Sequence, residues 1–89
     1  MHETAKVRLT ESGVWQICLF ADDWVPVSDD DAQLIKRAWP VATAVAGGRE
    51  TGEAVAEMLD ELRRVLKRYD EFDAEVVLVE AAADQARNA

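Results

Sequence analysis

The residues of this chain that could take part in chemistry are mainly carboxylates, and they are grouped. Five acids with no base among them lie between residues 21 and 35, namely Asp22, Asp23, Asp29, Asp30 and Asp31. Six more, again with no base, lie between residues 69 and 86, namely Asp70, Glu71, Asp73, Glu75, Glu80 and Asp84. The two stretches together carry more negative charges than the net charge of the whole chain, which is −8. The charge is therefore segregated along the sequence.

Catalytic motifs are weak in this sequence. The first acidic stretch could offer oxygen ligands to Mg²⁺ or Ca²⁺, but it lacks the glycine and the distal glutamate of an EF-hand loop. The only cysteine, Cys18, falls in a predicted strand, and the only histidine, His2, falls at the start of the chain, which removes the usual general base. Residues 47–49 (GGR) lack the lysine of a phosphate-binding loop and indicate a helix end. We expect no enzymatic activity, no cofactor and no bound metal ion.

The most regular element that could position the acids is a helix over residues 51–69. Its apolar residues recur at the spacing of an amphipathic helix: Val55, Met58, Leu59, Leu62, Val65, Leu66 and Tyr69. Thr51 is a suitable N-cap, and acids fill the first half and bases the second, as the helix macrodipole favours. Asp60 and Arg64 are spaced for an ion pair within the helix.

Two strands are predicted before this helix. Residues 6–10 alternate polar and apolar side chains, and residues 14–20 are apolar on both faces. Gly13 can form the tight turn between them, so we expect a hairpin. Residues 22–27 are predicted to be a connection, because Pro26 cannot donate a hydrogen bond to a strand ladder.

A first helix is predicted to begin after Ser28, which with Asp31 three residues later has the pattern of a capping box. Pro40 interrupts the apolar stripe of this helix and leaves two interpretations of residues 41–45, either a continued, kinked helix or a short strand. We favour the helix, because alanine favours helix and the stripe keeps its phase across the proline.

A third strand is predicted over residues 75–79, whose continuous β-branched run is typical of a strand buried on both faces. Residues 81–89 are small and polar and are predicted to be a flexible tail. The sequence thus predicts an α+β fold with one compact domain over residues 1–80. Its expected order is β-β-α-α-β, a three-stranded sheet with two helices on one face.

The topology decides whether the two acidic stretches meet. If residues 41–45 are helical, most of both stretches converge at one end of the domain; if these residues are a strand, the stretches lie at opposite ends. Bases at the end of the second helix would dilute a converged patch: Arg63, Arg64, Lys67 and Arg68. Trp24, among the acids, is either an exposed binding anchor or folds back over the edge of the sheet.

A converged acidic surface can imitate the phosphate backbone of a nucleic acid. In size and charge the chain resembles small acidic inhibitors such as anti-restriction and anti-CRISPR proteins, which occupy the basic groove of a protein that handles nucleic acid. The prediction is a non-enzymatic interaction protein whose partner has a basic surface. The expected contact residues are Asp22, Asp23, Trp24, Asp29, Asp30, Asp31, Asp70, Glu71 and Asp73.

The alternative is a homodimeric accessory or regulatory subunit. The apolar stripe over residues 55–69 would then bury against a second copy, and the acids would only confer solubility. In both cases the negative charge argues against direct binding to nucleic acid or to anionic lipid. The single cysteine and the lack of a long apolar run indicate a cytoplasmic protein with no membrane segment.

Overall fold

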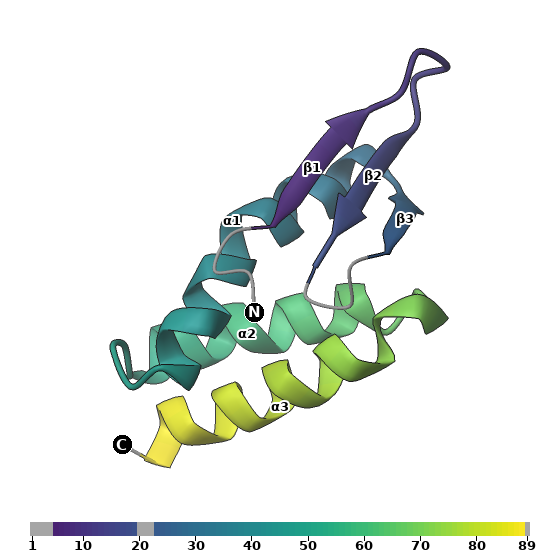
Figure 1. Ribbon diagram of the computed structural model, residues 1–89. Helices are drawn as coiled ribbons and strands as arrows, with labels where there is room; N and C mark the ends of the chain where they lie inside the picture. Colours follow the sequence, from purple (N-terminus) through teal and green to yellow (C-terminus); the bar gives the residue numbers. More distant parts are fainter. Residues whose placement is uncertain (1–4, 20–22, 89) are drawn as a thin grey trace.

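The computed structural model describes residues 5–19 and 23–88 (Figure 1). Within them, three strands come first and helices follow: β1 (Lys6–Leu9), β2 (Trp15–Cys18), β3 (Trp24–Val27), α1 (Asp29–Ala46), α2 (Glu53–Leu66), the 3-10 turn η1 (Asp70–Phe72) and α3 (Asp73–Asn88). The predicted α+β class and three-stranded sheet are confirmed. The order differs, because the third strand precedes the helices and a third helix takes the place of the predicted last strand.

The three strands form one antiparallel sheet in the order of the chain. The predicted hairpin of β1 and β2 is confirmed, with Lys6 opposite Cys18. The connection predicted over residues 22–27 is wrong in its second part, because residues 24–27 form β3. Pro26 is tolerated there, since β3 is an edge strand and needs hydrogen-bond donors on one side only. Val25 and Val27 of β3 are buried, whereas Trp24 and Pro26 are exposed.

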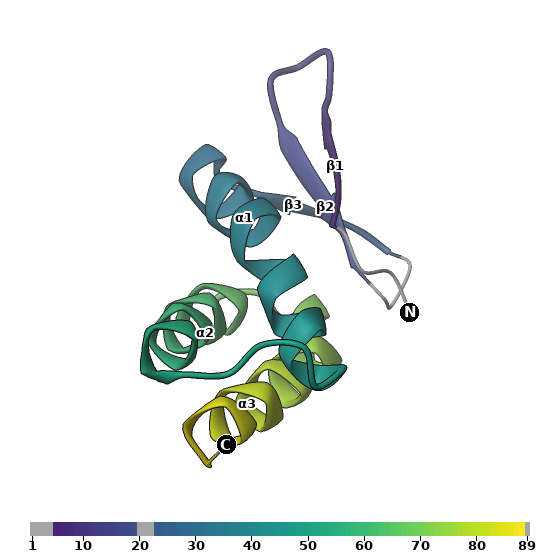
Figure 2. The same cartoon turned by 90° about the vertical axis from the view of Figure 1, so that its left-hand side faces the viewer.

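Helix α1 begins where the sequence predicts, with Ser28 as N-cap and its Oγ accepting a hydrogen bond from the Asp31 N–H (3.2 Å). It continues through Pro40 to Ala46, so the helical interpretation of residues 41–45 is confirmed. A proline removes one helical hydrogen bond, and Figure 2 shows α1 changing direction in its middle. The bend brings the first half of α1 against the sheet and the second half against α2 and α3.

The end of α1 is closed by a Schellman motif. The Arg49 N–H donates to the Ala44 carbonyl (2.8 Å) and the Gly48 N–H donates to the Val45 carbonyl (2.9 Å). Gly48 has a φ of 74°, a backbone conformation that side chains disfavour. Gln85 of α3 also donates to the Val45 carbonyl (2.9 Å), which ties the end of α1 to α3.

Helix α2 is the predicted amphipathic helix, and Leu59, Leu62 and Leu66 are fully buried. Burying one leucine side chain stabilises the fold by roughly 1.5–3 kcal/mol relative to leaving it exposed. The N-cap is Gly52 rather than the predicted Thr51, and the helix ends at Leu66 rather than at residue 69. Because α1 and α3 pack against α2, its apolar stripe is covered within the chain.

The strand predicted over residues 75–79 is wrong, because these residues belong to α3. A strand buried on both faces would hide Val77, but Val77 is 67% exposed. The buried residues of α3 recur at helical spacing instead: Glu75, Val76, Val79, Ala82, Ala83 and Ala86. The segment from residue 81, predicted to be a flexible tail, forms the second half of this helix up to Asn88.

Helix α1 lies between the sheet and the antiparallel pair α2–α3 (Figures 1 and 2). It covers one face of the sheet, where Ile17 and Val25 are buried, and none of the helices in residues 5–19 and 23–88 covers the outer face. The radius of gyration is 12.5 Å. Each helix among the described residues is too short or too polar to span a membrane.

Candidate functional site

The first acidic stretch forms the first turn of α1. Asp29, Asp30 and Asp31 follow the Ser28 cap, and carboxylates at this position are stabilised by the positive end of the helix dipole. Asp29 and Asp30 are exposed, and Asp29 accepts a hydrogen bond from Gln33 Nε2 (3.3 Å). Asp31 is turned inward, with its side chain only 8% exposed. The capping turn therefore presents two carboxylates to solvent and one to the interior.

Tyr69 connects this turn to the end of α2. Its hydroxyl accepts a hydrogen bond from the Ser28 N–H (3.3 Å) and donates one to Asp31 Oδ2 (2.5 Å). In a capping box the acidic side chain would reach the N-cap amide directly, whereas here the tyrosine hydroxyl lies between the two groups. Arg68 Nη1 binds the other carboxylate oxygen, Asp31 Oδ1, at 2.8 Å. We call this arrangement of Ser28, Asp31, Arg68 and Tyr69 the tyrosine bridge.

The environment of the bridge favours the neutral phenol. Burial raises the pKa of Tyr69 above its usual value, and the hydrogen bond to the Asp31 carboxylate raises the pKa further. The neutral hydroxyl is the form that can donate to Asp31 while it accepts from the Ser28 amide. The bridge is therefore intact at neutral pH.

The second acidic stretch begins directly after the bridge. Asp70 and Glu71 lie in η1, Asp73 opens α3, and all three are exposed. Phe72 between them is buried and contacts the Tyr69 ring edge-to-face, with 5.8 Å between ring centroids. The bridge and Phe72 thus place the start of the second stretch beside the end of the first. We call the five exposed residues the acidic pole: Asp29, Asp30, Asp70, Glu71 and Asp73.

The remaining residues of the predicted site lie elsewhere. Asp22 is outside the described residues, and Asp23 precedes β3, at the opposite end of that strand from Ser28. The added strand separates residues 22–23 from residues 29–31, because β3 carries the chain away from its start. Convergence therefore holds for residues 29–31 with 70–73 and does not extend to Asp23.

Trp24 contacts a basic side chain on the outer face of the sheet. It is 37% exposed on the outer face of the sheet, and the Arg8 guanidinium lies over its ring, 4.0 Å from the centroid. The register places Lys6, Cys18 and Trp24 in one cross-strand row on that face. The charged side chain that contacts the Trp24 ring is therefore a cation, Arg8 of β1.

The bases at the end of α2 point in several directions. Arg68 is bound to Asp31 in the bridge. Arg63 points toward α3, where its Nε pairs with Glu80 Oε2 (3.2 Å). An open groove of about 470 Å³ runs between α1 and α2, with Asp30, Glu61, Arg37 and Arg68 among its lining residues. Its charges are mixed, and Asp30 belongs to both the groove and the acidic pole.

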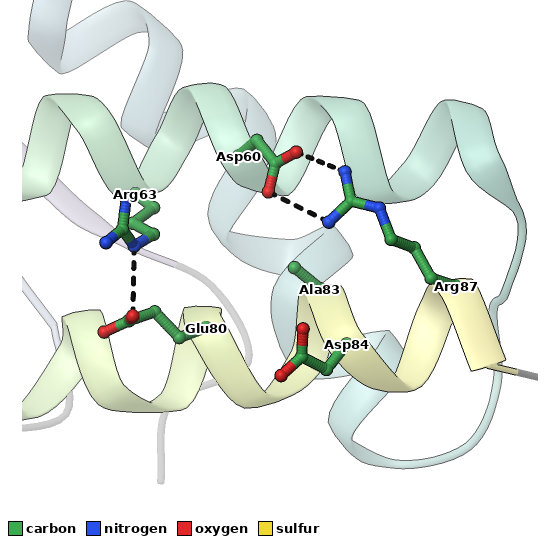
Figure 3. Close-up of a pocket in the computed structure, with 6 residues that line it drawn as sticks. All are labelled: Asp60, Arg63, Glu80, Ala83, Asp84 and Arg87. Carbon is green, nitrogen blue, oxygen red and sulfur yellow. Dashed lines mark hydrogen bonds and ion pairs between the residues drawn. The ribbon is translucent and has the colours of Figure 1, made fainter.

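The seam between α2 and α3 holds further ion pairs (Figure 3). Asp60 binds Arg87 of α3 through both carboxylate oxygens, rather than the predicted partner Arg64. The hydrogen bond from Arg87 lowers the pKa of Asp60 and raises that of Arg87. Together with Arg63–Glu80, this pair borders a hollow of about 150 Å³. Asp60 and Glu80 of the seam are therefore each paired with an arginine of the same chain.

Histidine, cysteine and clustered acidic side chains are the remaining candidates for chemistry. Among the described residues, no group of three or more histidine, cysteine or acidic side chains is placed to hold a metal ion. Cys18 is buried, and His2 lies outside the described residues. Glu75, fully buried in α3, adds no charge to the surface. Two charged surfaces of the described residues stand out, the acidic pole and the cationic, aromatic outer face of the sheet. Comparison of the chain with protein-family models, curated proteins and solved structures gave no match in any of the three.

Proposed function

We propose that this protein is a non-enzymatic interaction module whose acidic pole occupies a basic surface of another protein. The observation that carries this proposal is the tyrosine bridge, which joins two acidic stretches that are about forty residues apart in sequence. The bridge links the first turn of α1 to the residue that precedes η1. With it, five exposed carboxylates lie around one end of a small domain.

The charges of the pole are available to a partner. Among the described residues, none of the five pole carboxylates forms an ion pair, whereas Asp60, Glu53 and Glu80 are paired along the α2–α3 seam. The bridge arginine, Arg68, is engaged with Asp31, which is not part of the exposed set. The pole can therefore exchange its solvent and counterions for cationic side chains.

The class of partner follows from charge and rigidity. A compact cluster of carboxylates on helix starts is fixed in position, as the phosphates of a nucleic acid are, and basic nucleic-acid-binding grooves are the common complement of such a surface. The proposed role is thus an inhibitor of the anti-restriction or anti-CRISPR kind, acting in the cytoplasm. Association with such a surface is accelerated by electrostatic steering, and it weakens as salt shortens the screening length.

A charge-matched pair of variants tests this function. The pole variant is Asp30→Asn/Asp70→Asn/Glu71→Gln, and the control is Glu50→Gln/Glu57→Gln/Asp84→Asn, which removes three exposed carboxylates outside the pole. Both variants have the same net charge. The probe is an oligoarginine peptide, and its affinity is measured by calorimetry at low and at moderate salt. Folding of each variant is checked by circular dichroism.

The expected result is that the loss of affinity for the peptide depends on where the three carboxylates lie. At about 0.5 kcal/mol for each exposed charge contact, three contacts amount to roughly tenfold in affinity for the pole variant. The control should lose less than about threefold, because its charges act only through the screened long-range field. Equal losses in the two variants would overturn the proposal and favour acids that only confer solubility.

A further inference from the structure

The outer edge of β1 is a second surface with its own chemistry. The sheet order β1-β2-β3 leaves β1 paired on one side only, and no described strand lies along its other side. An unpaired edge presents backbone N–H and C=O groups that an extended segment can bind. The strand runs from Lys6 to Leu9 and contains no proline, so each of its residues keeps a backbone N–H.

The two edges of the sheet are not equivalent. β3, the opposite edge, contains Pro26, which has no backbone N–H. The hairpin of β1 and β2 also projects beyond α1 (Figure 2), and Leu9 near its tip is 55% exposed. Of the two edges, β1 is therefore the one that can accept a further strand.

The side chains of β1 specify which strand fits. Lys6 and Arg8 are exposed on the outer face, whereas Val7 and Leu9 point to the face that α1 partly covers. Arg8 is held in place by two contacts, a hydrogen bond from its Nε to Gln16 Oε1 (2.5 Å) and the Trp24 ring. A neighbouring strand would thus meet two cations on one face and two apolar side chains on the other.

This pattern disfavours a second copy of β1 paired with the same face outward. If two β1 strands paired with the same face outward, Lys6 and Arg8 would lie opposite Lys6 and Arg8 of the other copy, and like charges directly opposite each other destabilise a ladder. Carboxylates at alternate positions would meet the cations favourably, and apolar side chains between them would cover Val7 and Leu9.

We propose that β1 binds, by strand addition, an extended segment of a partner protein in which acidic and apolar residues alternate. This inference is independent of the acidic pole, because it uses opposite charges and a different part of the fold. Backbone hydrogen bonds between the strands supply the affinity, and Lys6 and Arg8 determine which partner sequence is preferred. A charged edge can also serve only to prevent aggregation, and the experiment separates this role from binding.

The test uses two capped synthetic peptides, one alternating valine with glutamate and the other alternating valine with lysine. Each is titrated into the isotope-labelled full chain, and amide shifts and amide hydrogen exchange are followed by NMR. The valine–glutamate peptide should bind at least about tenfold more tightly than the valine–lysine peptide. It should shift the amides of β1 and slow the exchange of those that point away from β2.

Two further measurements separate strand addition from simple charge attraction. A valine–glutamate peptide with N-methyl groups at alternate residues cannot complete the ladder and should bind at least about tenfold more weakly. The variant Lys6→Glu/Arg8→Glu should reverse the preference between the two peptides. Equal binding of the methylated peptide, no binding of either peptide, or shifts centred away from β1 would each overturn the proposal. The wild-type titrations decide it even if the variant fails to fold.

Discussion

Removal of a single oxygen atom tests the tyrosine bridge. The substitution Tyr69→Phe deletes the hydroxyl that joins the Ser28 N–H to Asp31 and keeps the ring that contacts Phe72 at 5.8 Å. It leaves the Arg68–Asp31 ion pair in place. Any change in stability then reports on the two hydrogen bonds alone.

The size of the effect follows from the kind of hydrogen bond lost. A hydrogen bond to a charged group contributes about 1.5–3 kcal/mol, and a neutral one about 0.5–1.5 kcal/mol. The bond to the Asp31 carboxylate is short at 2.5 Å, but the bond from Ser28 is long at 3.3 Å, and water can replace part of both because Tyr69 is only half-buried. We expect the free energy of unfolding to fall by about 2 kcal/mol, which lowers Tm by roughly 8–16 °C in a domain of this size.

The assay is urea denaturation at neutral pH, followed by tryptophan fluorescence. A double-mutant cycle with Asp31→Asn isolates the charged contact, and in that background Tyr69→Phe should cost about 1 kcal/mol less. Arg68→Ala is the comparison, and it should cost less than about 1 kcal/mol because the Arg68 side chain is 63% exposed. A Tyr69→Phe protein within about 0.5 kcal/mol of the wild type would refute the bridge as a structural link.

The same residue predicts a pH dependence at the alkaline end. Because the folded-state pKa of Tyr69 is raised above its value of 10.0, its contribution to stability is fully present below pH 10.0 and is lost as the pH rises through the folded-state pKa. Tyr69 is the only tyrosine, so near-ultraviolet absorbance follows its ionisation alone. A midpoint at or below the ordinary value would contradict the described environment.

Two further predictions concern the helices. Asp60→Asn should destabilise the fold by less than about 1 kcal/mol, because Asp60 and Arg87 form an exposed pair. The lowered pKa of Asp60 gives stability that is present above pH 3.8 and is lost as the pH falls through the folded-state pKa, so the difference between variant and wild type should vanish in acid. Denaturation across this pH range measures the difference, and an equal effect of Arg64→Ala would contradict the described pairing. Val79→Ala should cost about 1–3 kcal/mol because Val79 is fully buried, whereas Val77→Ala should cost less than about 0.5 kcal/mol; equal costs in thermal unfolding would contradict the orientation of α3.

The sequence predicts the elements that carry a strong local signal. Ser28 with Asp31 predicts the start of α1, and the alanine-rich stretch after Pro40 predicts its continuation. In α3, the four consecutive apolar residues 76–79 resemble a buried strand, and the helical stripe is missed when the periodicity is followed only to residue 80. Extending the count through Ala82, Ala83 and Ala86 reveals it. β3 is missed because Pro26 argues against a strand in general but not against an edge strand.

The candidate site is only partly predictable, because its connections are long-range. Tyr69 contributes to the α2 stripe in the sequence, and no local pattern indicates that its hydroxyl reaches Ser28. Asp60 has a suitable partner, Arg64, four residues later in the same helix, yet it binds Arg87 of α3. A rule for pairs within one helix does not predict this contact between two helices. The acids that converge do so because α1 and α2 bring their ends together. Trp24 lies at the start of β3, and the length of this strand, which the sequence did not indicate, separates it from residues 29–31.

The most direct test of the account is an NMR titration of the isotope-labelled protein with oligoarginine. If the two acidic stretches form one surface, the amides of residues 29–30 and 70–73 should shift together and follow one saturation curve, which moves to higher peptide concentration as salt is added. Amides near Glu50 and Glu57, exposed acids outside the pole, should shift little. Shifts confined to one of the two stretches, or spread evenly over all exposed acids, would contradict a shared acidic pole.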